Sequence, residues 1–257
     1  MALGRMNELL KPAFRALGVE LSRYRSTLEG SRVDVLRRAR VDVVVDGGAN
    51  VGDYAAALRK AGFEGRIVSF EPLPDVFRRL EERAAGDPAW RCLPYALGDS
   101  DGAMQMQVAA NAVSSSLLSM SDAHVDAAPG SGTVGTVDVT VRRLDTLASD
   151  IAGEHDRLAL KLDLQGYEGP ALEGAEGILG RVAVVEAELS TKPLYDGQML
   201  AHQVMTLLYD RGFGLVNFDK GLHDADHRVL QFDGLFVRPS TIAAPAEQTA
   251  PGETGKS

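Results

Sequence analysis

Residues 41–53 read VDVVVDGGANVGD, and this stretch decides the fold. The apolar, β-branched run at its start predicts a buried strand that ends on Asp46. A glycine-rich turn follows at once, and helical periodicity begins near Asp53. Gly48 and Gly52 have no Cβ, so the backbone can turn sharply there and a ligand can approach it closely. A strand, a glycine turn and a helix N-terminus in this order are typical of the nucleotide-cofactor site of an open α/β sheet.

The acidic residue that closes this strand distinguishes between two kinds of cofactor. A dinucleotide would bring its pyrophosphate close to the Asp46 carboxylate, which would repel it. S-adenosylmethionine instead carries a sulfonium and an ammonium group, which a carboxylate attracts. We therefore expect S-adenosylmethionine, held by the residues of this turn: Asp46, Gly47, Gly48, Ala49, Asn50, Gly52 and Asp53.

Glu71 is the second acidic residue expected at the cofactor. It closes the predicted strand 66–70 and follows Asp46 by 25 residues. A carboxylate at this place in a βαβ unit can accept hydrogen bonds from both ribose hydroxyls of a cofactor. The alternative is that Glu71 interacts with the dipole of the helix that follows, near 75–84. We favour the ribose role because the whole βαβ context is present.

Composition and charge restrict the class of protein. The chain has 257 residues, of which 45% are hydrophobic and 25% charged, so it is globular and long enough for one large α/β domain. Cys92 is its only cysteine, which favours a reducing compartment such as the cytoplasm. A net charge of −9 without a basic stripe argues against a nucleic-acid substrate. No apolar run approaches the ~20 residues that span a bilayer, so we expect no membrane partner.

Both ends of the chain differ from its middle. Near the N-terminus apolar side chains recur at helical spacing, which predicts an amphipathic helix: Met6, Leu9, Leu10, Phe14 and Leu17. We expect this helix to pack on the domain or on a second subunit, and the protein to be a homodimer. The Ala-, Pro- and Thr-rich end predicts a disordered tail. The expected division is an N-terminal helical extension over 1–40, a catalytic domain over 41–239 and the tail over 240–257.

Strands and helices alternate between these ends, which predicts an α/β fold with a seven-stranded, mainly parallel sheet and helices on both faces. The predicted strands are 41–46, 66–70, 91–95, 158–163, 182–188, 213–218 and 232–237, and the predicted helices lie near 53–61, 75–84, 168–179 and 198–211. The connection between the last two strands is too short for a helix, so the last strand should run antiparallel to its neighbour. An irregular insert over 99–145, with strand-like runs at 104–108 and 137–141, should lie over the active site.

Five motifs in one order carry a family resemblance: VDGGANVGDY, VSFEPLPDVFRRL, YALGDSDG, KLDLQGYEGPALEGAEGIL and VVEAELSTKPLYDGQML. Over about residues 40–238 the series resembles the FkbM family of S-adenosylmethionine-dependent O-methyltransferases. The resemblance implies a class I methyltransferase Rossmann-like fold and methylation of a hydroxyl on a sugar, a polyketide or a related small molecule. A carbohydrate hydroxyl is our leading expectation, with a mannose-containing oligosaccharide of the methylmannose polysaccharide type as one possible acceptor. Further cofactor contacts are expected at Leu73, Ala96, Leu97, Ser115 and Asp163.

Two carboxylates are expected at the carboxyl edge of the sheet, where ligands of open α/β folds bind. Asp163 should end the fourth strand and Glu188 the fifth. Together they could hold Mg²⁺, which prefers carboxylates and water and assists some relatives in the family. The alternative is that Lys161 neutralises one of them in an ion pair. We expect Glu186 to pair with Lys161 rather than to bind metal.

An acceptor hydroxyl also needs a group that takes its proton. His223 and His227 lie in the loop that leaves the sixth strand, and His124 lies in the insert. The sequence does not choose among them, and each could equally be structural.

Two other classes of protein remain possible. An NAD-dependent oxidoreductase is disfavoured by Asp46 and by the missing third glycine of the dinucleotide pattern, and a non-catalytic cofactor-binding protein need not retain the two carboxylates.

Overall fold

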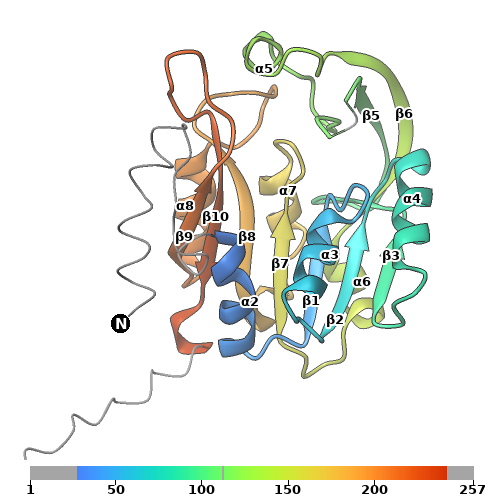
Figure 1. The fold of residues 1–257 in the computed structure, drawn as a ribbon, viewed down its shortest axis with the longest axis vertical. Coiled ribbons are helices and arrows are strands. Elements are labelled where there is room, and N and C mark those ends of the chain that lie inside the picture. Colours follow the sequence, from blue (N-terminus) through green and yellow to red (C-terminus); the bar gives the residue numbers. More distant parts are fainter. Residues whose placement is uncertain (1–27, 112, 242–257) are drawn as a thin grey trace, which may run out of the picture.

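The computed structural model describes residues 28–111 and 113–241, which fold around a seven-stranded sheet (Figure 1). Its strand order is β3-β2-β1-β7-β8-β10-β9. The strands are β1 (Val43–Gly47), β2 (Arg66–Phe70), β3 (Trp90–Leu93), β7 (Leu158–Leu162), β8 (Val182–Ser190), β9 (Gly214–Lys220) and β10 (Gln231–Val237). Strand β10 runs antiparallel to both β8 and β9, whereas the other pairs are parallel. The predicted fold class, with its antiparallel last strand, is confirmed.

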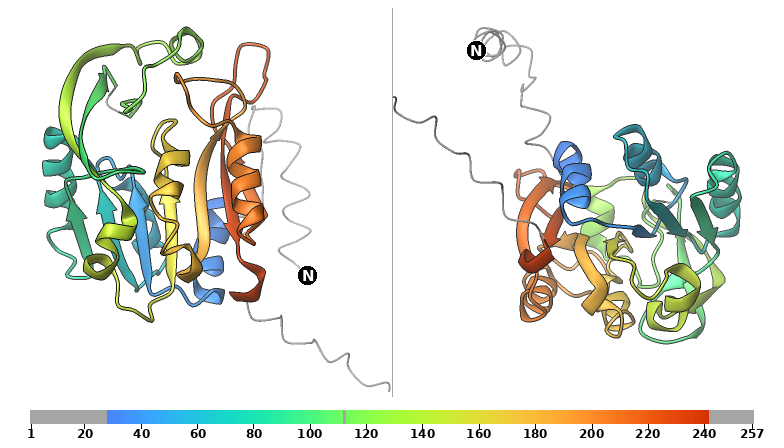
Figure 2. Two further views of the ribbon diagram at one scale, coloured as in Figure 1. Left: turned by 180° about the vertical axis from the view of Figure 1, so that it is seen from behind. Right: turned by 90° about the horizontal axis from the view of Figure 1, so that it is seen from below.

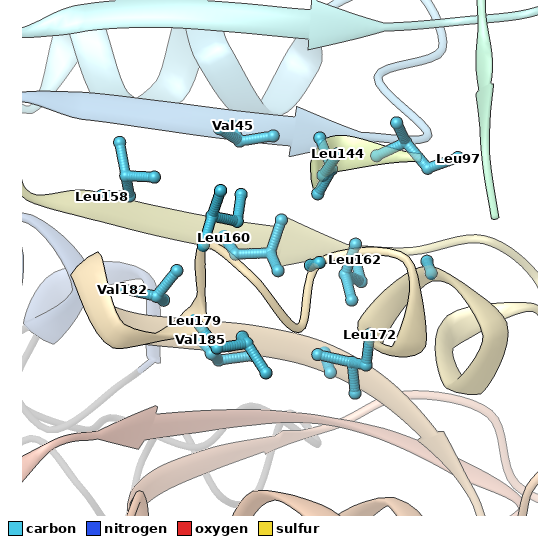
Figure 3. Close-up of a cluster of buried hydrophobic side chains, with 14 of the residues drawn as sticks. Val45, Leu97, Leu144, Leu158, Leu160, Leu162, Leu172, Leu179, Val182 and Val185 are labelled. Carbon is cyan, nitrogen blue, oxygen red and sulfur yellow. The ribbon is translucent and has the colours of Figure 1, made fainter. Parts of the chain in front are cut away.

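Helices cover both faces of this sheet (Figure 2). On one face lie α2 (Leu28–Arg38), α3 (Asp53–Lys60) and α4 (Pro74–Ala84), and on the other lie α6 (Leu144–Ile151), α7 (Glu168–Glu173) and α8 (Ala201–Asp210). Successive side chains of a strand point to opposite faces. Val44 therefore packs in the layer with α2 and α3, whereas Val43 and Val45 pack in the layer with α6 and α7. Figure 3 shows part of this second layer, in which Val45 and Leu160 lie near Leu144. Burial on both faces explains why β1 reads as a continuous apolar run.

The structure departs from the predicted helices on one face. The helix expected over 168–179 ends at Glu173, and a short 3-10 helix, η2 (Leu179–Arg181), follows a turn. Gly174 follows the last residue of α7, and glycine is required there because a Cβ would lie 1.9 Å from the backbone oxygen of Gly98. Helix α6 was not predicted, although Leu144, Leu147 and Ile151 recur at helical spacing and are buried. Its residues overlap the end of the region that we assigned to the insert.

The insert forms a second, three-stranded sheet above the carboxyl edge of the first (Figure 1). Strands β5 (Gly102–Ala109) and β6 (Thr133–Arg142) contain the two predicted strand-like runs, β4 (Ala96–Leu97) pairs with β6, and α5 (Asp122–Ala127) lies between β5 and β6 in the chain. An isolated bridge joins Met120 of the insert to Tyr195 of the main domain. This contact ties the far end of the insert to the loop that follows β8.

The N-terminal extension contributes to the main core. Leu28, Val33 and Leu36 of α2 are buried in the same layer as Leu58 of α3. The amphipathic helix predicted around 6–17 and the tail predicted from 240 lie almost wholly outside the described residues, so the predicted boundaries of the three parts stay predictions. Among the described helices, none is both long enough and apolar enough to cross a membrane.

The homodimer also stays a prediction, and the edge strand β9 offers a place for association because Val216 and Phe218 are 53% and 57% exposed. We expect light scattering of the full chain at micromolar concentration to give twice the 27.4 kDa of one chain. Changing Val216 and Phe218 to Thr should shift the mass toward the monomer, whereas Val134→Thr, an exposed valine of the insert, should leave it unchanged. A wild-type protein that scatters as a monomer would contradict the prediction.

Candidate functional site

The glycine turn after β1 packs directly on the end of β7. Gly48, Asn50 and Gly52 have φ angles of 71°, 48° and 84°, in the left-handed region that the sequence predicted for the glycines. A Cβ on Gly48 would lie 1.9 Å from the backbone oxygen of Asp163, and one on Gly52 would lie 2.8 Å from the Trp90 ring. Glycine is therefore required at Gly48 by the neighbouring backbone, before any cofactor is considered. This close approach brings the turn and Asp163 together.

Glu71 lies beside this turn and is bound to it. Its Oε2 accepts a hydrogen bond from the backbone N–H of Asn50 at 3.0 Å, and its Oε1 accepts one from the backbone N–H of Leu73 at 2.8 Å. Each carboxylate oxygen has a second lone pair that a ribose hydroxyl could use. Burial raises the pKa of Glu71 to about 7, although these two N–H groups partly oppose the shift. The predicted ribose ligand is therefore close to its titration point at neutral pH.

The Asp46 side chain lies in the interior of the protein. It is fully buried, accepts a hydrogen bond from the Ser69 hydroxyl at 2.9 Å and lies 3.4 Å from Lys161 Nζ. Its carboxylate therefore pairs with a buried lysine, because a buried charge must be paired, and its expected role toward a cationic cofactor stays a prediction. Lys161 also lies 3.6 Å from Asp163 Oδ2. This ammonium links the two acidic residues.

The expected pair of Lys161 with Glu186 does not form. Glu186 pairs with Arg32 of α2, whose Nε donates to Glu186 Oε2 at 2.7 Å. Lys161 instead donates to the backbone oxygens of Gly47 and Gly48 at 3.2 and 3.1 Å. An arginine that can reach both oxygens of a carboxylate at once competes well for Glu186.

Two adjoining pockets open at this edge of the sheet. The first, which we call the Glu71 pocket, has a volume of about 300 Å³. Its lining residues include Gly48, Asn50, Glu71, Leu73, Tyr95, Ala96, Leu97, Met106, Ser115, Asp163, Gln165, Tyr167 and Glu188. The second, the Arg32 pocket, has a volume of about 420 Å³ and is lined by residues such as Arg32, Ala49, Asn50, Asp53, Tyr54, Lys161, Asp163, Glu186, Glu188 and Asp233. Asp163 and Glu188 belong to both linings.

Most predicted cofactor contacts gather in the Glu71 pocket. Gly48, Asn50, Glu71, Leu73, Ala96, Leu97, Ser115 and Asp163 line it, whereas Ala49 and Asp53 line the Arg32 pocket. Three of the predicted contacts, Asp46, Gly47 and Gly52, line neither. These three residues support the turn from outside the two pockets: Gly47 packs on Leu97 and Gly52 packs on Trp90.

Asp163 and Glu188 converge on the side-chain amide of Gln165. Its Nε2 lies 2.9 Å from Asp163 Oδ1 and 2.9 Å from Glu188 Oε2. The Nε2 of Gln231 donates to the same Glu188 oxygen at 3.0 Å. Burial, then the nearby charge of Asp163, raises the pKa of Glu188 well above its usual value. The predicted pair of carboxylates is therefore assembled at the carboxyl edge of the sheet, and one of its members has a raised pKa.

The loop that carries Gln165 is bent sharply. Gln165 and Gly166 have φ angles of 53° and 96°. The buried carboxylate of Glu168 accepts hydrogen bonds from the backbone N–H groups of Leu164 and Gly166, at 2.8 and 3.2 Å. This side chain thereby fixes the bend that points Gln165 back toward Asp163.

None of the three predicted histidines lines either pocket. His124 is buried in the insert, where its Nε2 lies 3.3 Å from the Ser114 hydroxyl and its ring lies 5.1 Å from that of Tyr195. Burial lowers the pKa of His124. His223 binds the backbone oxygen of Gly221, and His227 is exposed in the loop between β9 and β10. The described linings of the two pockets contain carboxylates but none of these histidines, and the proton-accepting role of a histidine stays a prediction.

Several lining residues escaped the sequence analysis. Gln165 lies inside a motif that we quoted, so a signal for it existed, but the motif assigns it no orientation. Tyr95 and Tyr167 lie on elements that meet only in the folded chain. Arg32 and Asp233 lie far from every motif in sequence and reach the site from α2 and β10.

The described residues contain no group of three His, Cys, Asp or Glu side chains suited to a metal ion. The donor set at the predicted magnesium site consists of the two carboxylates Asp163 and Glu188 and the side-chain amide of Gln165. Mg²⁺ is commonly held by one or two carboxylates together with water and substrate oxygens. Two converging carboxylates therefore match its preference in kind, and the magnesium ion stays a prediction.

The chain is similar to known methyltransferases. A family model described as "Methyltransferase FkbM domain" matches residues 46–215. The 2-O-methyltransferase NoeI of Sinorhizobium fredii (strain NBRC 101917 / NGR234) is 24% identical over 172 residues, which cover 65% of this chain and 70% of NoeI.

Two solved structures show a more distant likeness. Magnesium protoporphyrin IX methyltransferase from Synechocystis PCC 6803, with bound S-adenosylmethionine, gives a TM-score of 0.43 at 11% identity and covers 90% of this chain and 96% of its own. A putative rRNA methylase from Clostridium thermocellum gives a TM-score of 0.45 at 10% identity and covers 85% of this chain and 100% of its own.

The pKa of Glu71 leads to a prediction for cofactor binding. An ionised carboxylate accepts hydrogen bonds from hydroxyls more strongly than a neutral one, so affinity for S-adenosylmethionine should rise with pH up to about 7 and then level off. Glu71→Gln should weaken binding by ~1.5–3 kcal/mol and remove the pH dependence. Calorimetry between pH 5.5 and 8.5, with the exposed Glu64→Gln as control, measures both. Unchanged affinity in Glu71→Gln would refute the ribose assignment.

Proposed function

The chain belongs to the FkbM methyltransferase family and is an S-adenosylmethionine-dependent O-methyltransferase, and from this premise we propose that its acceptor is a hydroxyl of a sugar or an oligosaccharide. The observation that carries the proposal is the shared wall of the two pockets. Asp163 and Glu188 line both, so a donor in one pocket and an acceptor in the other would meet at these carboxylates. Membership of this family leaves the NAD-dependent oxidoreductase and the non-catalytic protein without support.

The Glu71 pocket suits the cofactor. Apolar and aromatic side chains such as Leu73, Leu97 and Tyr95 would pack on the adenine, and Glu71 would accept the ribose hydroxyls. Gly48 and Asn50 lie where the pocket meets the Arg32 pocket, so the methionine part would reach toward Asp163. When bound, S-adenosylmethionine supplies an electrophilic methyl group. The chain has to present an acceptor oxygen in line with that methyl group.

Glu188 is the group that we propose to take the acceptor proton. A sugar hydroxyl is a very weak acid, so a base must remove its proton as the methyl group is transferred. Oε2 of Glu188 accepts from Gln165 and Gln231, whereas no hydrogen bond within the described part of the chain reaches Oε1. The raised pKa of Glu188 makes this oxygen a stronger base than an ordinary carboxylate. Asp163, whose side chain is 39% exposed, would accept a second hydrogen bond from the acceptor.

The polar lining of the Arg32 pocket supports a sugar as the acceptor over a polyketide. Its side chains are mainly charged or hydrogen-bonding, and Tyr54 is its one aromatic residue. An apolar secondary metabolite would leave these groups without partners, which is costly. A hydroxyl on a polyketide or another secondary metabolite remains the alternative acceptor. The name of NoeI, a 2-O-methyltransferase, is consistent with oxygen as the methylated atom.

We further propose that the reaction takes place in the cytoplasm and involves neither nucleic acid nor a membrane. The single Cys92 suits a reducing compartment. The net charge of −9 opposes binding to a phosphate backbone.

Magnesium assistance is a second proposal about the same carboxylates. Tyr195 has one hydroxyl proton but two acceptors within reach, Ser114 O at 3.1 Å and Gln165 Oε1 at 2.7 Å. A side-chain amide can present nitrogen or oxygen in the same place. With the amide turned, Tyr195 would accept from Gln165 and donate to Ser114, so both contacts would be satisfied. Gln165 would then present an oxygen to Asp163 and Glu188, and these three would hold Mg²⁺, which supplies a Lewis acid for the acceptor oxygen.

The two carboxylates can be tested without reference to the metal. Asp163→Asn and Glu188→Gln should each lower turnover by about 10²–10⁴-fold, the usual contribution of a positioned base. Binding of S-adenosylmethionine should fall much less than turnover, because Glu71 and the apolar wall of the Glu71 pocket remain unchanged. Transfer of a labelled methyl group to a panel of glycans measures turnover, and the exposed Asp210→Asn serves as control. Wild-type turnover in either variant would contradict the proposed role.

The metal is tested by chelation. We expect EDTA to abolish methyl transfer and added Mg²⁺ to restore it, with binding of S-adenosylmethionine unchanged in both conditions. Gln165→Leu should lower the affinity for Mg²⁺, since it removes one of three oxygen donors. Full turnover in EDTA by a metal-free preparation would refute magnesium assistance and leave Glu188 as the base acting alone.

A further inference from the structure

The Arg32 pocket has walls that come from outside the family domain. The match to the FkbM domain covers residues 46–215, whereas Arg32 lies on α2 and Asp233 lies on β10. Both residues nevertheless line a pocket that shares Asp163 and Glu188 with the Glu71 pocket. Its volume of about 420 Å³ lies within the range of small-molecule sites, ~300–1,000 Å³. Two described residues of the pocket wall therefore come from outside the matched domain, whereas the rest of the described lining lies within it.

Arg32 is held in a fixed orientation. It forms a two-point ion pair with Glu186, and its Nε donates to Glu186 Oε2 at 2.7 Å. Its guanidinium lies 4.7 Å from the centre of the Tyr54 ring, whose hydroxyl donates to the same Glu186 oxygen at 3.0 Å. The side chains of Arg32 and Glu186 are only 13% and 7% exposed. The cluster thus presents a rigid set of polar groups at the pocket wall.

This cluster fits hydroxyl groups. A guanidinium has five N–H donors, and the bonds to Glu186 use two of them. The remaining N–H donors can donate hydrogen bonds to the oxygen of a hydroxyl. The carboxylate oxygens of Glu186 and Asp233 can accept the hydrogen bond that the same hydroxyl donates. Adjacent donors and acceptors of this kind match neighbouring hydroxyls of a sugar, each of which donates and accepts at once.

An anionic acceptor fits less well. The buried cations of this pocket already have carboxylate partners: Arg32 has Glu186, and Lys161 has Asp46 and Asp163. Arg79, the third cation of the lining, is exposed and therefore screened by solvent. The carboxylates of Glu188 and Asp233 also line this pocket. An added carboxylate or phosphate would meet these acidic groups without a cation of its own.

We propose that the Arg32 pocket binds the acceptor as a neutral carbohydrate, and that Arg32 with Glu186 determines its specificity by binding two neighbouring hydroxyls. This inference rests on the proposed function. It adds that recognition of the acceptor depends on α2, outside the FkbM domain.

The test uses the full chain, labelled S-adenosylmethionine and defined acceptors. The probes are methyl α-mannopyranoside and short mannose oligosaccharides, each compared with the corresponding compound that carries a carboxylate at C6. Arg32→Met should raise the KM of the neutral acceptor by about tenfold or more, as expected for lost charge-assisted hydrogen bonds, and should change kcat less. Arg32→Lys keeps a charge beside Glu186 and guards against misfolding, and it should raise the same KM. Arg38→Met, an exposed arginine of the same helix, is the matched control.

The outcomes separate this inference from the proposed function. Calorimetry should give the same affinity for S-adenosylmethionine in wild type and in every arginine variant, because Arg32 does not line the Glu71 pocket. An unchanged acceptor KM in both Arg32 variants, or equal use of the C6 carboxylates, would overturn the inference while leaving sugar methylation intact. A wild-type enzyme that binds S-adenosylmethionine but methylates no carbohydrate would overturn the proposed function itself, and this inference with it.

Discussion

The buried ammonium of Lys161 is the interaction on which the site depends. It lies between Asp46 at the end of β1 and Asp163 at the end of β7, and it donates to the backbone oxygens of the glycine turn. Removing one partner of a buried pair leaves an uncompensated charge, which costs about 3–5 kcal/mol. The fully buried Asp46 would carry that cost if the ammonium were lost. The glycine turn and the carboxylates of Asp46 and Asp163 are therefore parts of one electrostatic unit.

Several carboxylates surround the single ammonium of Lys161 at the carboxyl edge of the sheet, and this arrangement explains the raised pKa of Glu188. Lys161 is shared between Asp46 and Asp163, so Glu188 has no cation in direct contact and depends on the amides of Gln165 and Gln231. Neutral donors stabilise an ionised carboxylate less than a cation does, and burial then raises its pKa. Asp163 stays exposed enough to meet a ligand. Two carboxylates at one edge of the sheet thus have different surroundings: Asp163 has an ammonium partner, and Glu188 has amide partners.

Sequence reasoning succeeded where a pattern is local and failed where partners are distant. The β-branched runs, the glycine turn and the strand ends at Asp163 and Glu188 follow from periodicity and sheet topology, so fold and carboxylate pair were predictable. The choice of Arg32 over Lys161 as partner of Glu186 was not, since Arg32 precedes Glu186 by 154 residues and no pattern links them. Burial of His124 behind Tyr195 likewise depends on how the insert folds back.

The division of the site between chain segments has a physical reason. Methyl transfer needs the same two features for every acceptor: a binding site for S-adenosylmethionine and a base beside its methyl group. In the proposed mechanism both lie at the ends of β1, β2, β7 and β8, where the sheet fixes their spacing. The proposed acceptor pocket takes residues from these strands and also from α2, which can change without moving the strands. Helix α2 packs on the sheet through Val33 and Leu36 and leaves Arg32 facing the pocket. If the Arg32 pocket binds the acceptor as proposed, substitutions on that polar face would alter recognition while the apolar face keeps the helix in position.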